Sequence, residues 1–175
     1  MNDGTANSNV FDLQIDVDPV NDAPVITGQN TVSTNEDQQL AIALNHLIVT
    51  DPDDTYPSDF TLSVLPGTNY TLAGNTITPA LNFNGLLTVK VQVNDGAATS
   101  AIFDLNVQVT PVNDAPAITG QFDINTDEEE SVTIQLFHLV VNDIDNSYPT
   151  GFNLSVSSGS NFTVSGNTVT PVANF

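Results

Sequence analysis

The sequence predicts an all-β protein made of tandem antiparallel β-sandwich repeats. The pentapeptide Val-Asn-Asp-Ala-Pro occurs at 20–24 and again at 112–116, so the chain has a period of 92 residues. Within one period, about seven short stretches alternate apolar and polar residues and are separated by turn signals. No stretch has the spacing of an amphipathic helix. Small domains with many short, evenly spaced strands are typically two-sheet sandwiches.

The first stretch of the chain predicts a half-buried strand at 10–17. Its apolar residues lie on one side and its polar residues on the other: Phe11, Leu13, Ile15 and Val17 against Asp12, Gln14 and Asp16. The same pattern recurs 92 residues later, in Phe103, Leu105, Val107 and Val109. Residues 1–19 are therefore predicted to be the last strand of a preceding repeat.

A complete repeat is predicted at 20–111. Strands are expected near 23–27, 40–44, 60–64, 70–72, 76–78, 87–91 and 103–109. Residues 45–49 fit either a strand or a short helical turn, Glu36 is expected in a turn, and 51–54 in a loop. Ala73-Gly74-Asn75 is a hairpin signal. The expected sandwich is immunoglobulin-like, without the Cys and Trp that mark antibody domains.

A second repeat is predicted at 112–175, truncated before its last two strands. A little over half of its positions are identical to those at 20–83, and it stops at the equivalent of Phe83. Equivalents of the strands that carry Leu87 and Phe103 are then missing. We consider an exchange in which residues 2–19 of a neighbouring molecule supply the Phe103-type strand.

Composition excludes several function classes. The chain has 21 acidic residues against one base, for a formal net charge of −20, which excludes nucleic acid and anionic membrane surfaces as partners. No run of about 18 apolar residues is present, so no membrane insertion is expected. Cys is absent, which removes disulfides and thiolate chemistry. No signal peptide is present, and Met1 leads directly into a domain-like sequence, so we expect an excised segment of a longer protein.

Acidic residues that recur at the period of 92 are the candidate metal ligands. They pair Asp22 with Asp114, Glu36 with Glu128, Asp51 with Asp143, Asp53 with Asp145 and Asp3 with Asp95, all in predicted loops. Two carboxylates about 4 Å apart repel by roughly 4 kcal/mol at an effective dielectric constant near 20. Calcium takes six to eight oxygen ligands and would neutralise such a cluster. The alternative is that these acids are merely solvated.

The order of these motifs resembles cadherin repeats, most closely the cadherin-like tandem repeats of large bacterial surface and secreted adhesins. It runs Asn-Asp-x-Pro, Glu, Asp-x-Asp, then Asp-Gly before the last strand, and covers the whole chain. The resemblance implies Ca²⁺ at the junctions between sandwiches.

By the same resemblance, the upstream junction would use Asn21, Asp22, Asp51, Asp53 and Asp95. The central junction would use Glu36, Asn113, Asp114, Asp143 and Asp145. Glu128 would serve a third junction. Asn82-Phe83-Asn84 stands where the family has an acidic motif, which implies fewer ions per junction, with affinities near 10⁻⁴ to 10⁻³ M.

The function that this resemblance implies is a calcium-stiffened structural extender of an extracellular or cell-surface adhesin. Its partners would be neighbouring repeats of the same chain, and another adhesin or a surface glycan. The alternative is a module that binds a polysaccharide or a protein, but Trp is absent and only Tyr56, Tyr70 and Tyr148 could form a sugar platform. A passive spacer of a large secreted protein is a third interpretation.

We expect no enzyme, because a paired-carboxylate active site would not repeat in every module. His46 and His138 lie in apolar runs without ligand spacing, which indicates a packing role.

Overall fold

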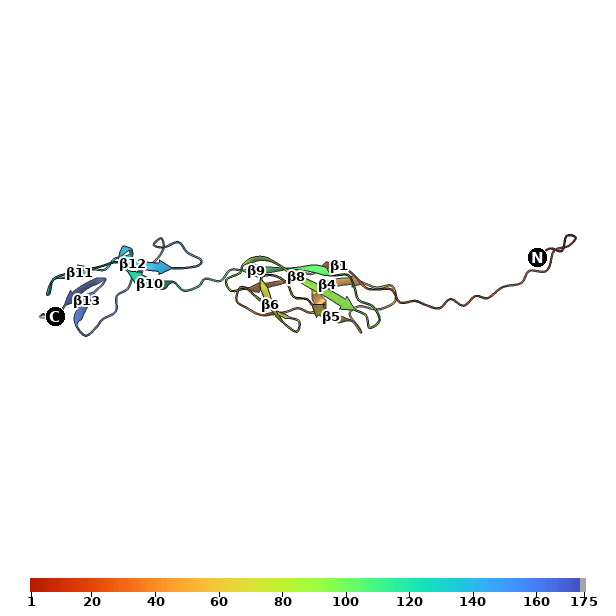
Figure 1. Ribbon diagram of the computed structural model, residues 1–175, viewed down its shortest axis with the longest axis horizontal. Helices are drawn as coiled ribbons and strands as arrows, with labels where there is room; N and C mark the ends of the chain where they lie inside the picture. Colours follow the sequence, from red (N-terminus) through yellow and green to blue (C-terminus); the bar gives the residue numbers. More distant parts are fainter. Residues whose placement is uncertain (174–175) are drawn as a thin grey trace.

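The computed structural model describes residues 1–173 and has three parts in line (Figure 1). An extended N-terminal segment leads into a sandwich that holds β1 to β9, and a thin linker leads on to a smaller unit that holds β10 to β14. The helical content of the described residues is two short 3₁₀ turns. The all-β, immunoglobulin-like class predicted from the sequence is confirmed.

The first repeat contains nine strands and one 3₁₀ turn, η1. Their bounds are β1 Val25–Gln29, β2 Ser33–Asn35, β3 Leu40–Ala41, η1 Leu44–His46, β4 Leu47–Thr50, β5 Thr61–Val64, β6 Tyr70–Ala73, β7 Thr76–Pro79, β8 Gly85–Asn94 and β9 Phe103–Thr110. The second repeat contains β10 Ala117–Gln121, β11 Val132–Thr133, η2 Leu136–His138, β12 Leu139–Asn142, β13 Phe162–Ser165 and β14 Thr168–Pro171.

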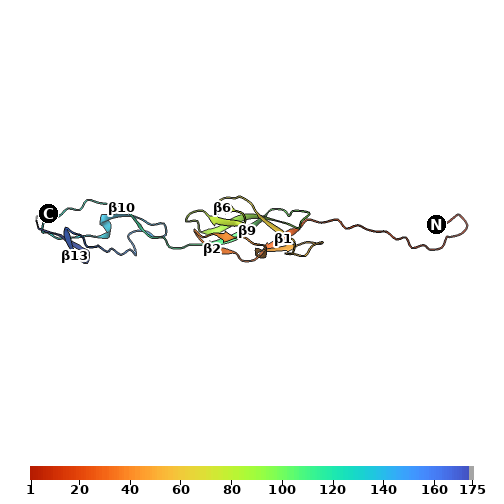
Figure 2. The ribbon, with the colours of Figure 1, turned by 90° about the horizontal axis from the view of Figure 1, so that it is seen from below.

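The strands β2, β9, β8 and β5 form a four-stranded sheet in the first repeat, and Figure 2 labels two of them, β2 and β9. The other strands form the three-stranded sheet β3-β7-β6 and the pair β1-β4. All pairs are antiparallel except β2 with β9, which is parallel and departs from the predicted arrangement. The inward side chains of β8 and β9 are the centre of the core: Leu87, Val89, Val91, Val93, Leu105, Val107 and Val109 are each at most 1% exposed. Strict alternation in the sequence therefore located the core correctly.

The segment 45–49, which fitted both a strand and a helical turn, contains both. The turn η1 ends at His46 and β4 begins at Leu47. The Nδ1 atom of His46 accepts a hydrogen bond from the Ala43 backbone N–H at 3.3 Å, and His138 closes η2 in the same way on Gln135 at 3.1 Å. The two histidines therefore stabilise local turns, as a structural role predicts.

The strand predicted at 10–17 is not formed, which corrects the sequence-based expectation. These residues have no regular structure, and Phe11, Leu13 and Ile15 are 81%, 75% and 74% exposed. The equivalent strand, β9, is held by β8 on one edge and β2 on the other, and no described segment lies beside residues 10–17. A strand without a hydrogen-bonding partner is not stable in water. That residues 1–19 are the last strand of a preceding repeat stays a prediction.

The second repeat reproduces one part of the first. The pair β10-β12 and the sheet β11-β14-β13 match β1-β4 and β3-β7-β6, whereas the four-stranded sheet has no counterpart within residues 112–173. The equivalents of β2 and β5, at 125–127 and 153–156, are not strands, because β2 and β5 pair with β9 and β8. No residue at 112–173 is fully buried. The repeat boundaries at 20–111 and 112–175 stay a prediction from the sequence.

Leu105→Ala and Leu13→Ala test this difference, because the two leucines occupy equivalent positions of the period. Leu105 is 0% exposed, so its truncation should lower the free energy of unfolding of the first repeat by about 2–5 kcal/mol. Leu13 is 75% exposed, so its truncation should change that free energy by less than about 0.5 kcal/mol. Urea denaturation of the full chain measures both values. Equal effects of the two substitutions would contradict the described packing.

Candidate metal centre

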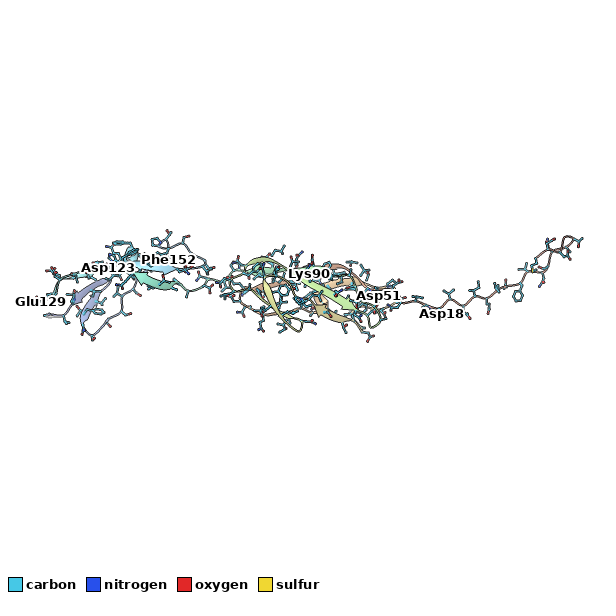
Figure 3. The ribbon with its side chains drawn as sticks, in the orientation of Figure 1. Asp18, Asp51, Lys90, Asp123, Glu129 and Phe152 are labelled. Atoms are coloured by element: carbon cyan, nitrogen blue, oxygen red, sulfur yellow. The ribbon has the colours of Figure 1, made fainter. Side chains whose placement is uncertain are left out.

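Two acidic loops meet at the end of the first repeat that the N-terminal segment enters. Asp51 directly follows β4, and Asp95 directly follows β8. Figure 3 labels Asp51 at this end of the sandwich, with Asp18 on the incoming segment. Because β4 and β8 both finish here, residues 44 positions apart in the sequence lie side by side.

Three carboxylates of this end could hold one cation. Asp51, Asp54 and Asp95 each offer an oxygen, and these oxygens lie within 4.8 Å of one another. Ligands on opposite sides of a calcium ion, each at 2.3–2.6 Å, are about 5 Å apart. The Oδ2 atom of Asp51 is shielded from solvent and accepts no hydrogen bond. The spacing and this unpartnered oxygen both fit a divalent cation.

The protein stabilises these carboxylates unequally. Loss of hydration raises the pKa of Asp54, and the negative charges of Asp51 and Asp95 raise it further. Hydrogen bonds from the backbone N–H groups of Ala98 and Ala97, at 2.6 and 2.7 Å, lower the pKa of Asp95. Asp95 is therefore held as a carboxylate, while the charge on Asp54 has no compensating partner.

The linker residues at this end are attached by hydrogen bonds. The side-chain amide of Asn21 donates to Asp95 Oδ2 at 3.1 Å, and the backbone N–H of Asp22 donates to Asp53 Oδ2 at 2.7 Å. Asp51 Oδ1 accepts from the backbone N–H groups of Asp53 and Asp54. The structure thus brings the five residues predicted for the upstream junction to one place. Asp53 anchors the linker there, while Asp51 and Asp95 face Asp54.

At the opposite end of the first repeat, Glu36 contacts the second linker. Glu36 is 3% exposed, in the turn that follows β2. Its Oε1 atom accepts from the backbone N–H of Val112 at 2.5 Å, and its Oε2 atom accepts from the Asn84 side-chain amide at 3.3 Å. The carboxylate therefore ties the end of the first repeat to the chain that enters the second.

The second repeat contacts the same linker from the other side. The backbone N–H of Asp114 donates to Asp145 Oδ2 at 2.6 Å, which repeats the contact of Asp22 with Asp53. Asp143 Oδ1 accepts from the backbone of Asp145, and the Asn146 side-chain amide donates to Asn113 Oδ1 at 2.9 Å. The period in the sequence therefore corresponds to a repeated junction in space.

Carboxylates of both repeats act on Asp114. Loss of hydration raises its pKa, and the negative charges of four residues raise it further: Asp145, Asp37, Glu36 and Asp143. Asp37 and Glu36 belong to the first repeat, whereas Asp143 and Asp145 belong to the second. The Oδ2 atom of Asp114 is shielded from solvent and has no hydrogen-bond partner. The central junction thus gathers acids from two repeats and their linker.

Glu128 is not brought together with other acidic residues predicted as ligands. It is exposed in the turn equivalent to that of Glu36, and Figure 3 labels the next residue, Glu129, at the far end of the second repeat. Glu36 is buried because Val112 and Asn84 cover it. The third junction proposed for Glu128 stays a prediction.

Three participants were missed by the sequence reasoning. Asp54 does not recur as an acid, because its equivalent is Asn146, although an amide oxygen is also a calcium ligand. Asp37 had a detectable signal, since its equivalent, Glu129, is also acidic. Asn84 stands where the resemblance places an acidic motif, but its contact with Glu36 was not predicted, because it joins residues 48 positions apart.

The three tyrosines face inward and do not form an exposed platform. Tyr70 is 8% exposed and donates to the Leu65 carbonyl at 2.5 Å. The hydroxyl groups of Tyr56 and Tyr148 donate to the carbonyls of Leu44 and Leu136. Tyr56 and Tyr148 are half-buried, so the three tyrosines do not present a common exposed face.

The folded first repeat, with acidic loops at both ends, defines an immunoglobulin-like repeat module. The family model described as bacterial Ig domain matches residues 21–108, just over half of the chain. The chain therefore belongs to the bacterial Ig domain family, which confirms the predicted class of repeat.

Similar solved structures come from cadherin ectodomains. The protocadherin GammaB4 extracellular domain is 21% identical, with a TM-score of 0.44 over 90% of this chain and 28% of that one. The human desmocollin-1 ectodomain is 16% identical, with a TM-score of 0.37 over 90% of this chain and 32% of that one. The chain thus spans about a third of the length of these structures. A comparison with curated protein sequences finds no match.

Among the described residues, no helix is long and apolar enough to cross a membrane.

Asp114→Asn should raise the melting temperature of the calcium-free protein. The pKa of Asp114 is raised in the folded state, so its negative charge destabilises the fold at neutral pH. As the pH falls through the folded-state pKa, Asp114 is protonated and this destabilisation disappears. Asp123→Asn is the matched control, because Asp123 is an exposed acid of the same repeat. Calorimetry in chelator between pH 4 and 8 measures both variants. The increase for Asp114→Asn should shrink as the pH falls. A decrease in melting temperature, or an equal increase for Asp123→Asn, would contradict the described junction.

Proposed function

We propose that this chain is a calcium-stiffened extender of an extracellular bacterial adhesin. The observation that carries the proposal is the convergence of acids at Asp114. Glu36 and Asp37 of one repeat, and Asp143 and Asp145 of the next, act on a linker carboxylate whose Oδ2 atom is shielded and unpartnered. Such a junction couples the binding of a cation to the relative position of two repeats.

The donor set supports a hard cation. The candidate ligands are carboxylate and amide oxygens, without thiolate or imidazole. Calcium and magnesium prefer oxygen, and calcium accepts the larger, less regular shells that loops supply. Asp51, Asp53 and Asp95 would serve the upstream junction with Asn21 and Asp22. Glu36, Asn113, Asp114, Asp143 and Asp145 would serve the central one. Asp54 and Asp37 join these sets.

The described protein supplies no cation of its own for these clusters. Lys90 is the only Lys or Arg of the chain, and its ammonium pairs with Asp104 at 3.0 Å on β9. Neutralisation must therefore come from solvent. A bound divalent ion would bridge the repeats, whereas diffuse monovalent ions would only screen the repulsion.

The shape of the chain supports an extender role. The two repeats follow one another along one axis (Figure 1), and Figure 3 labels Asp51 at one end of the first repeat and Glu129 at the far end of the second. Ions at the ends of modules set the angle between them, and thereby the length of the whole array. The adhesin itself, its surface location and its target belong to this proposal and not to the described fold.

Calcium should raise the melting temperature and narrow the range of lengths in solution. One ion at ten times a dissociation constant near 10⁻³ M stabilises by about 1.4 kcal/mol, which corresponds to roughly 5–10 °C for a domain of this size. Calorimetry and small-angle scattering, in chelator and in about 10 mM calcium, measure the two effects.

The double variant Asp51→Asn/Asp143→Asn should lose most of this calcium response, because it removes one negative charge from the candidate ligands at each junction. The control Asp123→Asn should keep it. A wild-type chain whose melting temperature and scattering curve are unchanged by calcium would rule out the proposal.

A further inference from the structure

Asn84 is the one asparagine of the chain that a glycine follows. It is exposed and lies outside regular structure, immediately before Gly85, the first residue of β8. Gly85 has a φ of 107°, and a Cβ built on it would meet no atom within 4 Å. The missing side chain and this open space leave room for the Gly85 nitrogen to approach the side chain of Asn84.

The position of Gly85 at the end of a strand favours this approach. Gly85 pairs with Val109 at the end of the β8-β9 ladder, where pairs open more readily than in its interior. By contrast, Asn106 lies inside β9 and precedes Val107. The backbone N–H and C=O of Asn106 are both hydrogen-bonded to the Gln29 side chain at 2.8 Å. Of these two exposed asparagines, Asn84 is therefore the one placed for attack by the following nitrogen.

The side chain of Asn84 contacts the acidic end of the first repeat. Its amide nitrogen donates to Glu36 Oε2 at 3.3 Å. Glu36 is 3% exposed, and its other oxygen accepts from the backbone N–H of Val112 in the linker. The charge of Glu36 is also one of those that raise the pKa of Asp114. The amide of Asn84 is thus a neutral donor at the edge of the acidic central junction.

We propose that Asn84 deamidates spontaneously in the folded chain and that the new carboxylate joins the acids of the central junction. The backbone nitrogen of Gly85 attacks Cγ of Asn84, the new C–N bond closes a succinimide ring, and the Cγ–Nδ2 bond breaks. Ammonia leaves with the proton that the Gly85 nitrogen loses. Water then opens the ring at Cγ to give aspartate, or at the backbone carbonyl to give isoaspartate. Water is the only co-reactant, and nothing is oxidised or reduced.

Either product replaces a hydrogen-bond donor by a negative charge beside Glu36. Two carboxylates repel each other across the 3.3 Å that the hydrogen bond now spans, and the repulsion is weakly screened where Glu36 is shielded from water. A calcium ion between the two would be bound by both, and the affinity of a calcium site rises with the number of its charged ligands. The effect on calcium rests on the proposed function, whereas the deamidation itself does not. The junction therefore depends more on a cation as the protein ages.

Peptide mapping by mass spectrometry tests the reaction. During incubation of the full chain in chelator at mildly alkaline pH, Asn84 should convert to aspartate and isoaspartate well before Asn106 does. The control is Asn84→Gln, because its longer side chain would have to close a larger and less favourable ring, so position 84 should stay an amide. Conversion of Asn106 as fast as that of Asn84, or an unchanged Asn84, would overturn the proposal.

The variant Asn84→Asp carries the aspartate product from the start. Its matched control, Asn106→Asp, adds the same charge on the exposed face of β9. In chelator, calorimetry should give Asn84→Asp a melting temperature roughly 5 °C below that of Asn106→Asp, because only the first places a charge beside Glu36. In about 10 mM calcium this difference should disappear.

Two outcomes would overturn the role at the junction. One is an equal melting temperature for the two variants in chelator. The other is a difference that calcium leaves unchanged although the wild-type chain responds to calcium. A wild-type chain that does not respond to calcium overturns the proposed function instead, and the peptide masses then decide the deamidation alone.

Discussion

Like-charged carboxylates at the ends of the repeats are the constraint on which the arrangement of this chain depends. The sandwich faces are stabilised by apolar packing, but the linkers are held by acids: Glu36 accepts from Val112, and Asp145 accepts from Asp114. Each contact brings another carboxylate close to its neighbours, and the one base, Lys90, is paired elsewhere. The hydrogen bonds that position the linker thus concentrate negative charge around it. These hydrogen bonds define the position of the linker, and in the proposed function a bound cation would offset the charge.

Pairing between strands that are distant in the sequence is the second determinant of this structure. Stretches that are 92 residues apart show this, because they are equivalent in sequence but differ in structure. Asp3 and Asp95 form the same local turn: Asp3 Oδ1 accepts from the backbone of Thr5 and Ala6, and Asp95 Oδ1 from that of Ala97 and Ala98. Yet the residues after the first turn are extended and solvent-exposed, whereas those after the second form β9. A turn needs only its own residues, but a strand needs neighbours. Equivalent sequences therefore differ in structure according to what lies beside them.

The sequence was sufficient for the features that local rules control. Alternation predicted the buried side of β8 and β9, and Gly74 and its neighbours predicted the hairpin of β6 and β7. The period predicted several of the acids that gather, but not Asp54 or Asp37. It was not sufficient where contacts join distant residues. The parallel pairing of β2 with β9 has no signature in three residues, and the approach of Asp54 to Asp95 depends on how two loops fold together. The strand expected at 10–17 failed for the same reason, since its pattern was right but its partner was absent.

The central claim is that a cation fixes the angle between the two repeats at Asp114. Distances between spin labels on the two repeats test this most directly, because the chain has no Cys and two introduced cysteines would be labelled uniquely. Thr88 on β8 and Thr163 on β13 are exposed and lie outside the junction. The account predicts a broad distance distribution in chelator that becomes narrow in millimolar calcium, and that stays broad when Asp114→Asn is added. A distribution of the same width with and without calcium would contradict it.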